Sequence, residues 1–281
     1  KNAITEHVFE TYERPTNYDH LISVHRVLQK IKYQKLNLTK EGCRDIYHTS
    51  TGRRKANELL KNYTYIDYNL FGTVTGRLTT LPDSFPILTL KKEFRKLLKP
   101  HNDWFISLDY NAAEARTMLQ LNEQEQPAGD VHRWNIENLF DEDTERETAK
   151  TIFFAWLYNP DSEVFESVHY DRKKVLDKWY RGGYIYTPHG RKILVDDRRA
   201  LNYLIQSATS DRVLQRAVDI DKFLEGKKSF ISHIVHDEIV IDLNDEERSD
   251  LAEIKKIFEQ DEFKANVQAA KNYFDFKELK I

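Results

Sequence analysis

The middle of the chain contains an apolar run that ends in an acidic residue. Phe105–Leu108 has the composition of a short buried strand, and helix-forming residues follow from Ala112, with Glu114 in the predicted first turns. The pattern therefore places Asp109 at a strand-to-helix junction, from which its carboxylate would project beyond the end of the strand. An Asp at such a junction is also common as a helix cap, so Asp109 needs a partner before it indicates a catalytic site.

A second acidic position lies far downstream, within Phe230–Leu243. Apolar and β-branched residues flank His236-Asp237-Glu238 on both sides, which predicts two strands joined by a tight acidic turn. Carboxylates at two strand ends can together hold two Mg²⁺ ions about 3.5–4 Å apart, the arrangement used for in-line phosphoryl transfer. Magnesium prefers oxygen ligands, so Asp and Glu suit it and cysteine is not required.

Residues at intervals of four mark two further helices. Arg146, Lys150, Phe154 and Tyr158 would form a slanting stripe about 18 Å long on one helix face. Two cations can neutralise a triphosphate, and two aromatic rings can stack on a sugar and a base. Pro160 disfavours helix at the preceding residue, so this helix is predicted to end near Asn159.

The second such helix is expected over Arg198–Ala217. Arg198, Asn202 and Gln206 would lie on one of its faces within about 12 Å, suited to hydrogen bonds with sugar-phosphates and base edges. Three polar residues on a helix are otherwise simply its solvated face.

Several shorter patterns complete the picture. Gly72 and Gly76 permit tight turns beside Thr75 and Arg77, whose donors can bind phosphates. A hairpin is expected over Tyr184–Ile193, with its turn at Pro188-His189-Gly190. An amphipathic helix is expected in the N-terminal part, where the apolar positions are Leu21, Val24, Val27, Leu28 and Ile31. A basic run precedes the strand at 105, with a solvated face and DNA contact equally open: Lys91, Lys92, Arg95, Lys96 and Lys99.

Composition excludes several classes of protein. The 281 residues include 43 Lys and Arg against 46 Asp and Glu, a net charge of −3, so any DNA-binding surface must come from local clustering. No apolar run approaches about 18 residues, so we expect no membrane span. The single cysteine, Cys43, excludes an internal disulfide and a cysteine-based zinc site, which favours a reducing, cytoplasmic setting. The chain begins at Lys1 without an initiating Met, which leads us to expect a fragment or a processed product.

Together these motifs resemble family A DNA polymerases, the bacterial DNA polymerase I type and its phage relatives. Asp109-Tyr110 with Glu114 and Arg116 resembles motif A, the stripe from Arg146 to Tyr158 motif B, and His236-Asp237-Glu238 motif C. The remaining matches are Thr75-Gly76-Arg77-Leu78, the Asp130-Val131-His132 segment, the polar helix face from Arg198, and the C-terminal strand within Phe263–Tyr273. The resemblance covers about residues 63–281, in the family's order.

The resemblance implies a role for each residue. Asp109 and Asp237, with the Tyr110 carbonyl, would hold two Mg²⁺ ions, for which Mn²⁺ could substitute. Arg146 and Lys150 would contact the triphosphate, with Lys150 also acting on the leaving pyrophosphate, while Phe154 lies against the sugar and Tyr158 guards the templating-base site. Glu114 would disfavour ribonucleotides, and His132 would be structural or adjacent to the nucleotide. The DNA contacts would come from Arg77, Thr75, Arg198, Asn202, Gln206 and His236, and Glu238 would help to shape the primer terminus.

The implied fold is an α+β right hand with an antiparallel palm sheet, helical fingers and a truncated thumb. The expected division is a thumb remnant over 1–65, palm over 66–118, inserted fingers over 119–205 and palm again over 206–281. Asn159 and Ala270 stand where the family usually has Gly, and most of the helices that complete the fingers are expected to be missing between Pro160 and Gly183.

The implied activity is template-directed DNA synthesis from deoxynucleoside triphosphates on primer-template DNA. We expect a monomer in the cytoplasm, the host's cytoplasm for a phage protein, with an exonuclease or accessory domain either upstream in a longer parent or absent. Three alternatives stay open: a non-catalytic DNA-binding remnant, an HD-type metal phosphohydrolase suggested by His236-Asp237, and an RNA polymerase of the same palm type. The HD fold needs its pair on a helix, and Glu114 favours deoxynucleotides.

Overall fold

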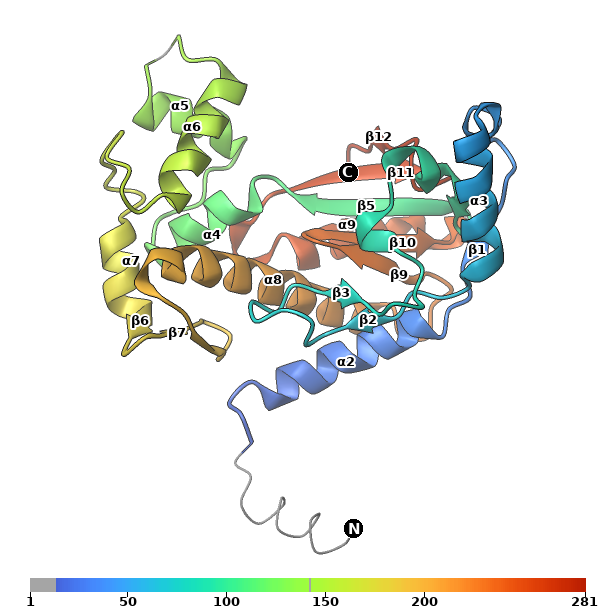
Figure 1. Cartoon of the computed structure of the whole chain (residues 1–281), viewed down its shortest axis with the longest axis horizontal. Coiled ribbons are helices and arrows are strands. Elements are labelled where there is room, and N and C mark those ends of the chain that lie inside the picture. The colour runs from blue at the N-terminus through green and yellow to red at the C-terminus, as the bar shows by residue number, and fades with distance from the viewer. Residues whose placement is uncertain (1–13, 142) are drawn as a thin grey trace, which may run out of the picture.

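A five-stranded antiparallel sheet forms the centre of the computed structural model, which describes residues 14–141 and 143–281. Its strand order is β12-β11-β5-β10-β9, so β5 (Trp104–Tyr110) is the middle strand (Figure 1). A strand flanked on both sides and covered on both faces must be apolar, and four consecutive residues of β5, Phe105–Leu108, are buried. The other strands of this sheet are β9 (Phe230–Val235), β10 (Glu238–Leu243), β11 (Ala265–Ala270) and β12 (Lys277–Glu278).

The helices and the short strands surround this sheet. The helices are α2 (Tyr18–Lys32), α3 (Ser50–Asn62), α4 (Ala113–Leu121), α5 (Val131–Leu139), α6 (Arg146–Tyr158), α7 (Arg172–Trp179), α8 (Asp197–Phe223) and α9 (Leu251–Phe258). The 3₁₀ segments of the described residues are η1 (Ile46–His48), η2 (Ile87–Thr89), η3 (Lys92–Leu97), η4 (Asp245–Asp250) and η5 (Gln260–Glu262). The remaining strands pair as β1 (Asn37–Leu38) with β4 (Leu98–Lys99), β2 (Tyr68–Asn69) with β3 (Thr79–Thr80), and β6 (Tyr180–Arg181) with β7 (Tyr184–Tyr186) and β8 (Lys192–Leu194).

The long helix α8 connects two hydrophobic cores. Its first half, through Ile205, packs with α4, α6 and α7, and its second half, from Val213, packs with the sheet, α2 and α9. Figure 1 shows α5, α6 and α7 gathered at one end of the molecule and α3 at the other. A single rigid helix that shares both cores fixes how the helical end sits on the sheet.

Most predicted elements are present, and two stretches differ from the prediction. The helix that carries Arg198 runs on to Phe223, because Val218 and Ile220 continue its buried face. The helix expected to end at Asn159 does so, with Asn159 as its C-cap. The stretch between Pro160 and Gly183, expected to lack most of the fingers helices, does form the eight-residue helix α7, capped by Asp171, which accepts from the Lys174 amide.

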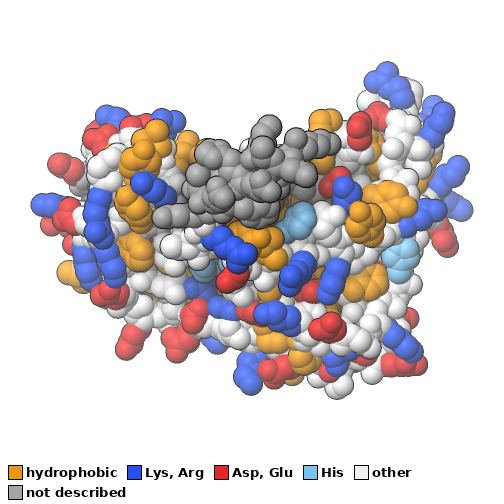
Figure 2. All heavy atoms as spheres, turned by 90° about the horizontal axis from the view of Figure 1, so that it is seen from below, with side chains coloured by type: hydrophobic (Ala, Val, Ile, Leu, Met, Phe, Trp, Pro, Cys, Tyr) orange, Lys and Arg blue, Asp and Glu red, His pale blue; other side chains and the backbone are white. Residues whose placement is uncertain are grey.

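The N-terminal helix is present as predicted over Tyr18–Lys32, with Val24, Val27, Leu28 and Ile31 buried against the core. The first thirteen residues of the expected thumb remnant lie outside the described residues. None of the helices in residues 14–141 and 143–281 combines the length and the apolar composition that crossing a bilayer requires. Figure 2 shows Lys and Arg interleaved with Asp and Glu over one face, in keeping with the nearly balanced composition.

Candidate active site

The two predicted carboxylates meet at one edge of the central sheet. Asp109 lies near the end of β5, and Asp237 lies in the two-residue turn that joins β9 to β10. The antiparallel register places Glu238 directly opposite Asp109, so the turn residue Asp237 comes next to it. Burial raises the pKa of Asp109 to about 7, and the charges of Asp237 and Glu238 contribute to the rise. Carboxylates crowded in this way are stabilised by a cation between them.

Two carboxylates, those of Asp109 and Asp237, are left to bind a metal, and this number suits magnesium. Both oxygens of Glu238 accept hydrogen bonds, from Ser107 Oγ at 2.6 Å and from the Tyr273 hydroxyl at 2.9 Å, so Glu238 is held by protein donors. The Tyr110 hydroxyl donates to the Phe258 carbonyl at 2.7 Å, which leaves only the Tyr110 carbonyl for a metal. Within residues 14–141 and 143–281, no three His, Cys, Asp or Glu side chains gather as a metal cluster. Magnesium commonly binds to one or two carboxylates and completes its shell with substrate phosphates and water.

A cavity of about 420 Å³ opens beside the acidic edge. Asp237 and His236 line it from the sheet, Lys150 and Phe154 line it from α6, and His132 lines it from α5. The other lining residues are Arg77, Ala112, Ala113, Glu114, Thr209 and Ser210. One space thus has acidic groups on the sheet side and a cation with an aromatic ring on the helix side.

The residues of the predicted stripe on α6 do not all face the same cavity. Lys150 and Phe154 line the cavity, and the Phe154 ring stacks on that of Tyr158, with centroids 6.1 Å apart and planes at 16°. Arg146 is not among the residues lining the cavity, and its guanidinium instead pairs with Asp130 at 2.8 Å and with Glu147 at 2.7 Å. Asp130 also caps α5, so the Arg146 pair joins the starts of the two helices.

Glu114 connects the sheet side of the cavity to α6. Its Oε1 accepts from Arg77 Nη2 at 2.6 Å and its Oε2 accepts from the Tyr158 hydroxyl at 2.5 Å. Burial and the neighbouring Glu114 charge raise the pKa of the Tyr158 hydroxyl, so it stays protonated and remains a donor. Three residues that the sequence placed in separate motifs therefore form one network.

His132 lies at the wall of the cavity as a buried, neutral side chain. Only 5% of its surface is exposed, and burial lowers its pKa. Its Nδ1 has no hydrogen-bond partner in the part of the chain that the structure describes. The ring lies edge-on to Phe154, with centroids 5.9 Å apart. This placement agrees with a residue adjacent to the nucleotide and gives no support to a metal ligand.

The predicted DNA contacts on α8 lie outside this cavity. Arg198 is exposed and pairs with Asp161 at 2.5 Å, while Gln206 donates to the Asn202 side chain. Arg198 and Asn202 line a separate cavity of about 340 Å³, together with Tyr158. Thr75 is 5% exposed, with its hydroxyl 3.5 Å from that of Thr73, so the structure buries this predicted DNA contact.

The basic run before β5 makes contacts within the protein. The Arg95 guanidinium lies 5.0 Å from the centroid of the Tyr273 ring, and Lys92 and Lys96 lie over the Phe274 ring at 5.7 and 4.6 Å. Three of the five cations therefore help to hold the C-terminal segment against the molecule.

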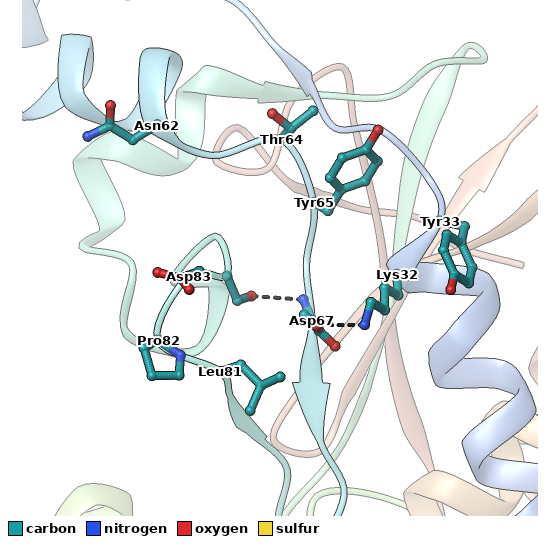
Figure 3. A pocket seen from close by; sticks show the side chains of 10 residues that line it. Lys32, Tyr33, Asn62, Thr64, Tyr65, Asp67, Leu81, Pro82 and Asp83 are labelled. Carbon is teal, nitrogen blue, oxygen red and sulfur yellow. Dashed lines mark hydrogen bonds and ion pairs between the residues drawn. The ribbon is translucent and has the colours of Figure 1, made fainter.

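A larger cavity, of about 630 Å³, lies elsewhere and lacks this chemistry. It is formed by the end of α2, the end of α3 and the segments flanking β2 and β3, with Tyr33 and Tyr65 on its wall (Figure 3). Its lysine, Lys32, is already paired with Asp67 at 2.9 Å. Neither carboxylate of the acidic edge lines this larger cavity.

Several residues of the site carried no separable signal in the sequence. Ser107 and Tyr273 hold Glu238, and Asp211 on α8 binds Arg191 of the β7–β8 hairpin. Arg116, fully buried, donates to three carbonyls on two segments, that of Asn111 after β5 and those of Pro127 and Gly129 before α5. Arg116 could have been found from the sequence because it is part of the motif A match. The other residues act through contacts between distant segments, which no local pattern indicates.

An antiparallel sheet with two carboxylates at one end of its strands, faced by a helix that carries a cation and an aromatic ring, is the arrangement expected of a right-hand polymerase. The comparisons agree. A solved structure of the POL domain of Pol1 from M. smegmatis, in complex with DNA primer-template and dNTP, matches 92% of this chain and 66% of its own with a TM-score of 0.63 at 15% identity. The fold is therefore that of a DNA polymerase I polymerase domain.

The sequence relatives are of the same kind. The thermostable DNA polymerase I of Thermus aquaticus is 24% identical over 293 residues, covering 84% of this chain and 34% of the relative. The DNA polymerase of Mycobacterium phage D29 is 26% identical over 173 residues, covering 49% of this chain and 28% of the relative. No protein-family model matches the chain. The resemblance to family A DNA polymerases is confirmed, and the chain spans about a third of the length of these relatives.

Proposed function

We propose that this chain is a DNA-directed DNA polymerase that transfers a nucleotide from a deoxynucleoside triphosphate to a primer 3′-hydroxyl and releases pyrophosphate. The observation that carries the proposal is the meeting of Asp109 and Asp237 at one sheet edge, beside a cavity whose opposite wall presents Lys150 and Phe154. Its partners would be primer-template DNA and the incoming nucleotide, the two ligands that the structural neighbour from M. smegmatis holds.

Asp109, Asp237 and the Tyr110 carbonyl would hold two Mg²⁺ ions, with Mn²⁺ as a substitute. The raised pKa of Asp109 supports this, because a buried carboxylate beside two others lacks a compensating positive charge. When bound, magnesium would lower the pKa of the attacking 3′-hydroxyl and neutralise charge on the phosphates.

The residues around the cavity would bind and orient the nucleotide. Lys150 would offset charge on the departing pyrophosphate or donate a proton to it, and Phe154 would lie against the sugar. Glu114, fixed between Arg77 and Tyr158, would close the space beneath the sugar and disfavour ribonucleotides. His132 would lie against the nucleotide as a neutral ring, and Arg146 would reach the triphosphate only on leaving Asp130.

The DNA would be held by backbone and minor-groove contacts, since template pairing selects the sequence. Arg77 and His236 would contact the primer terminus near the carboxylates, with Glu238 shaping that region from β10. Arg198, Asn202 and Gln206 would contact the template and primer from α8, and Thr75 would contact the DNA from the loop that carries Arg77.

The proposed division follows the two cores: fingers over 119–205 and palm over 66–118 and 206–281, with the thumb remnant over 1–65. Ile205 belongs to the core of the helical end, while Val213 belongs to the core of the sheet, which supports a boundary within α8. A monomeric state, a host-cytoplasmic setting and an upstream exonuclease or accessory domain stay predictions.

Primer extension on a defined template tests this function. Wild-type protein should extend the primer with Mg²⁺ and deoxynucleotides, and Asp109→Ala and Asp237→Ala should each abolish extension while still binding primer-template DNA. Asp221→Ala is the matched control, because this carboxylate lies near the far end of α8, paired with Lys30, and should leave extension unchanged. Wild-type protein that binds primer-template but adds no nucleotide with Mg²⁺ or Mn²⁺ would instead be a non-catalytic binding remnant.

A further inference from the structure

The residue before Arg77, Gly76, packs against an ion pair between Asp211 of α8 and Arg191 of the β7–β8 hairpin. Asp211 is fully buried, and Arg191 binds it with both arms, Nε to Oδ2 at 2.7 Å and Nη2 to Oδ1 at 2.7 Å. Two parallel hydrogen bonds to one carboxylate fix the plane of the guanidinium as well as its position. His20 of α2 approaches the same carboxylate, with its Nε2 3.7 Å from Oδ1.

The guanidinium of Arg191 forms a flat wall against Gly76. A Cβ placed on Gly76 would lie 2.5 Å from both Cζ and Nη2 of Arg191, far inside van der Waals contact. Gly76 also has φ of +80°, a conformation that other residues rarely adopt. The backbone of the loop can therefore pack against Arg191 only because this position is glycine.

A second contact, this one from α8, holds Gly76 on its carbonyl side. The Ser210 hydroxyl donates to the Gly76 carbonyl at 2.9 Å, and Ser210 directly precedes Asp211. The residue before that, Thr209, shares a hydrogen bond with Thr117 of α4 at 2.8 Å. Three consecutive residues of α8 thus connect to the helix after β5, to the Gly76 loop and to the β7–β8 hairpin.

Arg77 follows Gly76 directly and is the loop residue that reaches the candidate active site. Its Nη2 donates to Glu114 Oε1 at 2.6 Å, and its side chain lines the 420 Å³ cavity. Because Gly76 is fixed from two sides, the direction in which Arg77 leaves the loop is fixed as well.

We propose that Arg191 is a positioning residue: held by Asp211, it fixes Gly76 together with Ser210 and so directs Arg77 toward Glu114 and the primer terminus. Only one part of this inference rests on the proposed polymerase function, namely that the ligand contacted by Arg77 is the primer terminus. The positioning of Arg77 itself is a property of the free protein.

Arg191→Lys tests the proposal, because lysine keeps the charge and removes the planar, two-armed contact. We expect kcat/KM for extension of a matched primer to fall about 10- to 100-fold, the effect of misplacing a group by about 1 Å. In an Arg77→Ala background, the same Arg191→Lys substitution should cost less than about 2-fold, because the residue on which it acts is gone. If the fold-losses in kcat/KM of the two single variants simply multiply in the double variant, the proposal is overturned.

Arg212→Lys is the matched control, since Arg212 is likewise an arginine paired with an aspartate, Asp261 at 2.8 Å, and is not among the groups that crowd Gly76. The fold-loss in kcat/KM caused by Arg212→Lys should be the same with or without Arg77→Ala. A crystal structure of Arg191→Lys decides the case even for a protein that extends no primer. Arg77 displaced from Glu114 supports the proposal, and Arg77 unmoved at 2.6 Å from Glu114 overturns it.

Discussion

The hydroxyl of Tyr273, close to the C-terminus, donates a hydrogen bond to Oε2 of Glu238 at 2.9 Å. Tyr273 is 1% exposed, and its ring lies edge-on to His233, with centroids 4.5 Å apart, and beneath the Arg95 guanidinium. Ser107 on β5 supplies the other donor to Glu238. The C-terminal segment thus helps to fix the first residue of β10, directly after Asp237.

Tyr273→Phe should therefore weaken both stability and activity while keeping the ring in place. The free energy of unfolding at neutral pH should fall by about 1.5–3 kcal/mol, the contribution of a hydrogen bond to a charged group. We expect kcat to fall with little change in KM, because the displaced group neighbours Asp237. Denaturant unfolding and steady-state extension measure the two effects.

Tyr170→Phe is the control for that substitution. Its hydroxyl is also buried and donates to a neutral acceptor, Asn135 Oδ1, at 2.7 Å. This control should lose about 1 kcal/mol of stability and leave kcat unchanged. An unchanged kcat in Tyr273→Phe as well would show that turnover does not depend on the hydrogen bond from Tyr273 to Glu238.

Glu114 is predicted to select the sugar through its two fixed oxygens. Glu114→Ala frees space beneath the nucleotide and also leaves Arg77 and Tyr158 without their shared acceptor. The ratio of kcat/KM for a deoxynucleotide to that for the matching ribonucleotide should fall at least about 10-fold, a loss of about 1.4 kcal/mol of discrimination. Tyr158→Phe keeps Glu114 on Arg77 and should preserve most of that ratio.

Asp211 makes the protein sensitive to acid. Burial by itself would raise its pKa, but His20 and Arg191 outweigh burial and hold the pKa below the ordinary 3.8. A carboxyl whose folded pKa is lowered stabilises the protein above its unfolded pKa, and this stabilisation is lost as the pH falls through the folded value. We expect the loss to set in below about pH 4 in acid titrations followed by circular dichroism.

Asp211→Asn isolates this contribution. The variant should be less stable than wild type at pH 7 by about 3–5 kcal/mol, because Arg191 is left buried without its counter-charge. The difference between the two proteins should shrink as the pH falls below about 4. A difference that stays constant with pH would show that Asp211 does not titrate in this range.

Two turns at the acidic edge contain non-glycine residues with positive φ. Ala112, three residues after Asp109, has φ of 54°, and His236, directly before Asp237, has φ of 56°. An alanine in this conformation costs about 1 kcal/mol, so Ala112→Gly should stabilise the protein by up to that amount in chemical denaturation. A destabilised variant would mean that the Ala112 side chain, which lines the cavity, contributes more by packing than its backbone conformation costs.

Sequence patterns were sufficient for the elements of the site. The strand ending near Asp109, the hairpin carrying Asp237 and the helix carrying Lys150 and Phe154 all lie where periodicity and turn residues predicted them. The lengths of helices were less predictable, because α8 extends beyond Ala217 and α7 forms within a stretch of weak signal. Burial against neighbouring elements decided both.

The sequence by itself determined which residues are acidic, cationic or aromatic and on which kind of element each one lies, since helix and strand periodicities are local properties of the chain. Only the tertiary structure decided which hydrogen-bond partner each polar side chain of the site has. Glu114 bonds to residues 37 and 44 positions away, Tyr273 to one 35 positions away, and Asp211 to one 20 positions away. No local pattern specifies such pairs, because they form where separately folded elements pack together and a buried polar group must find a partner.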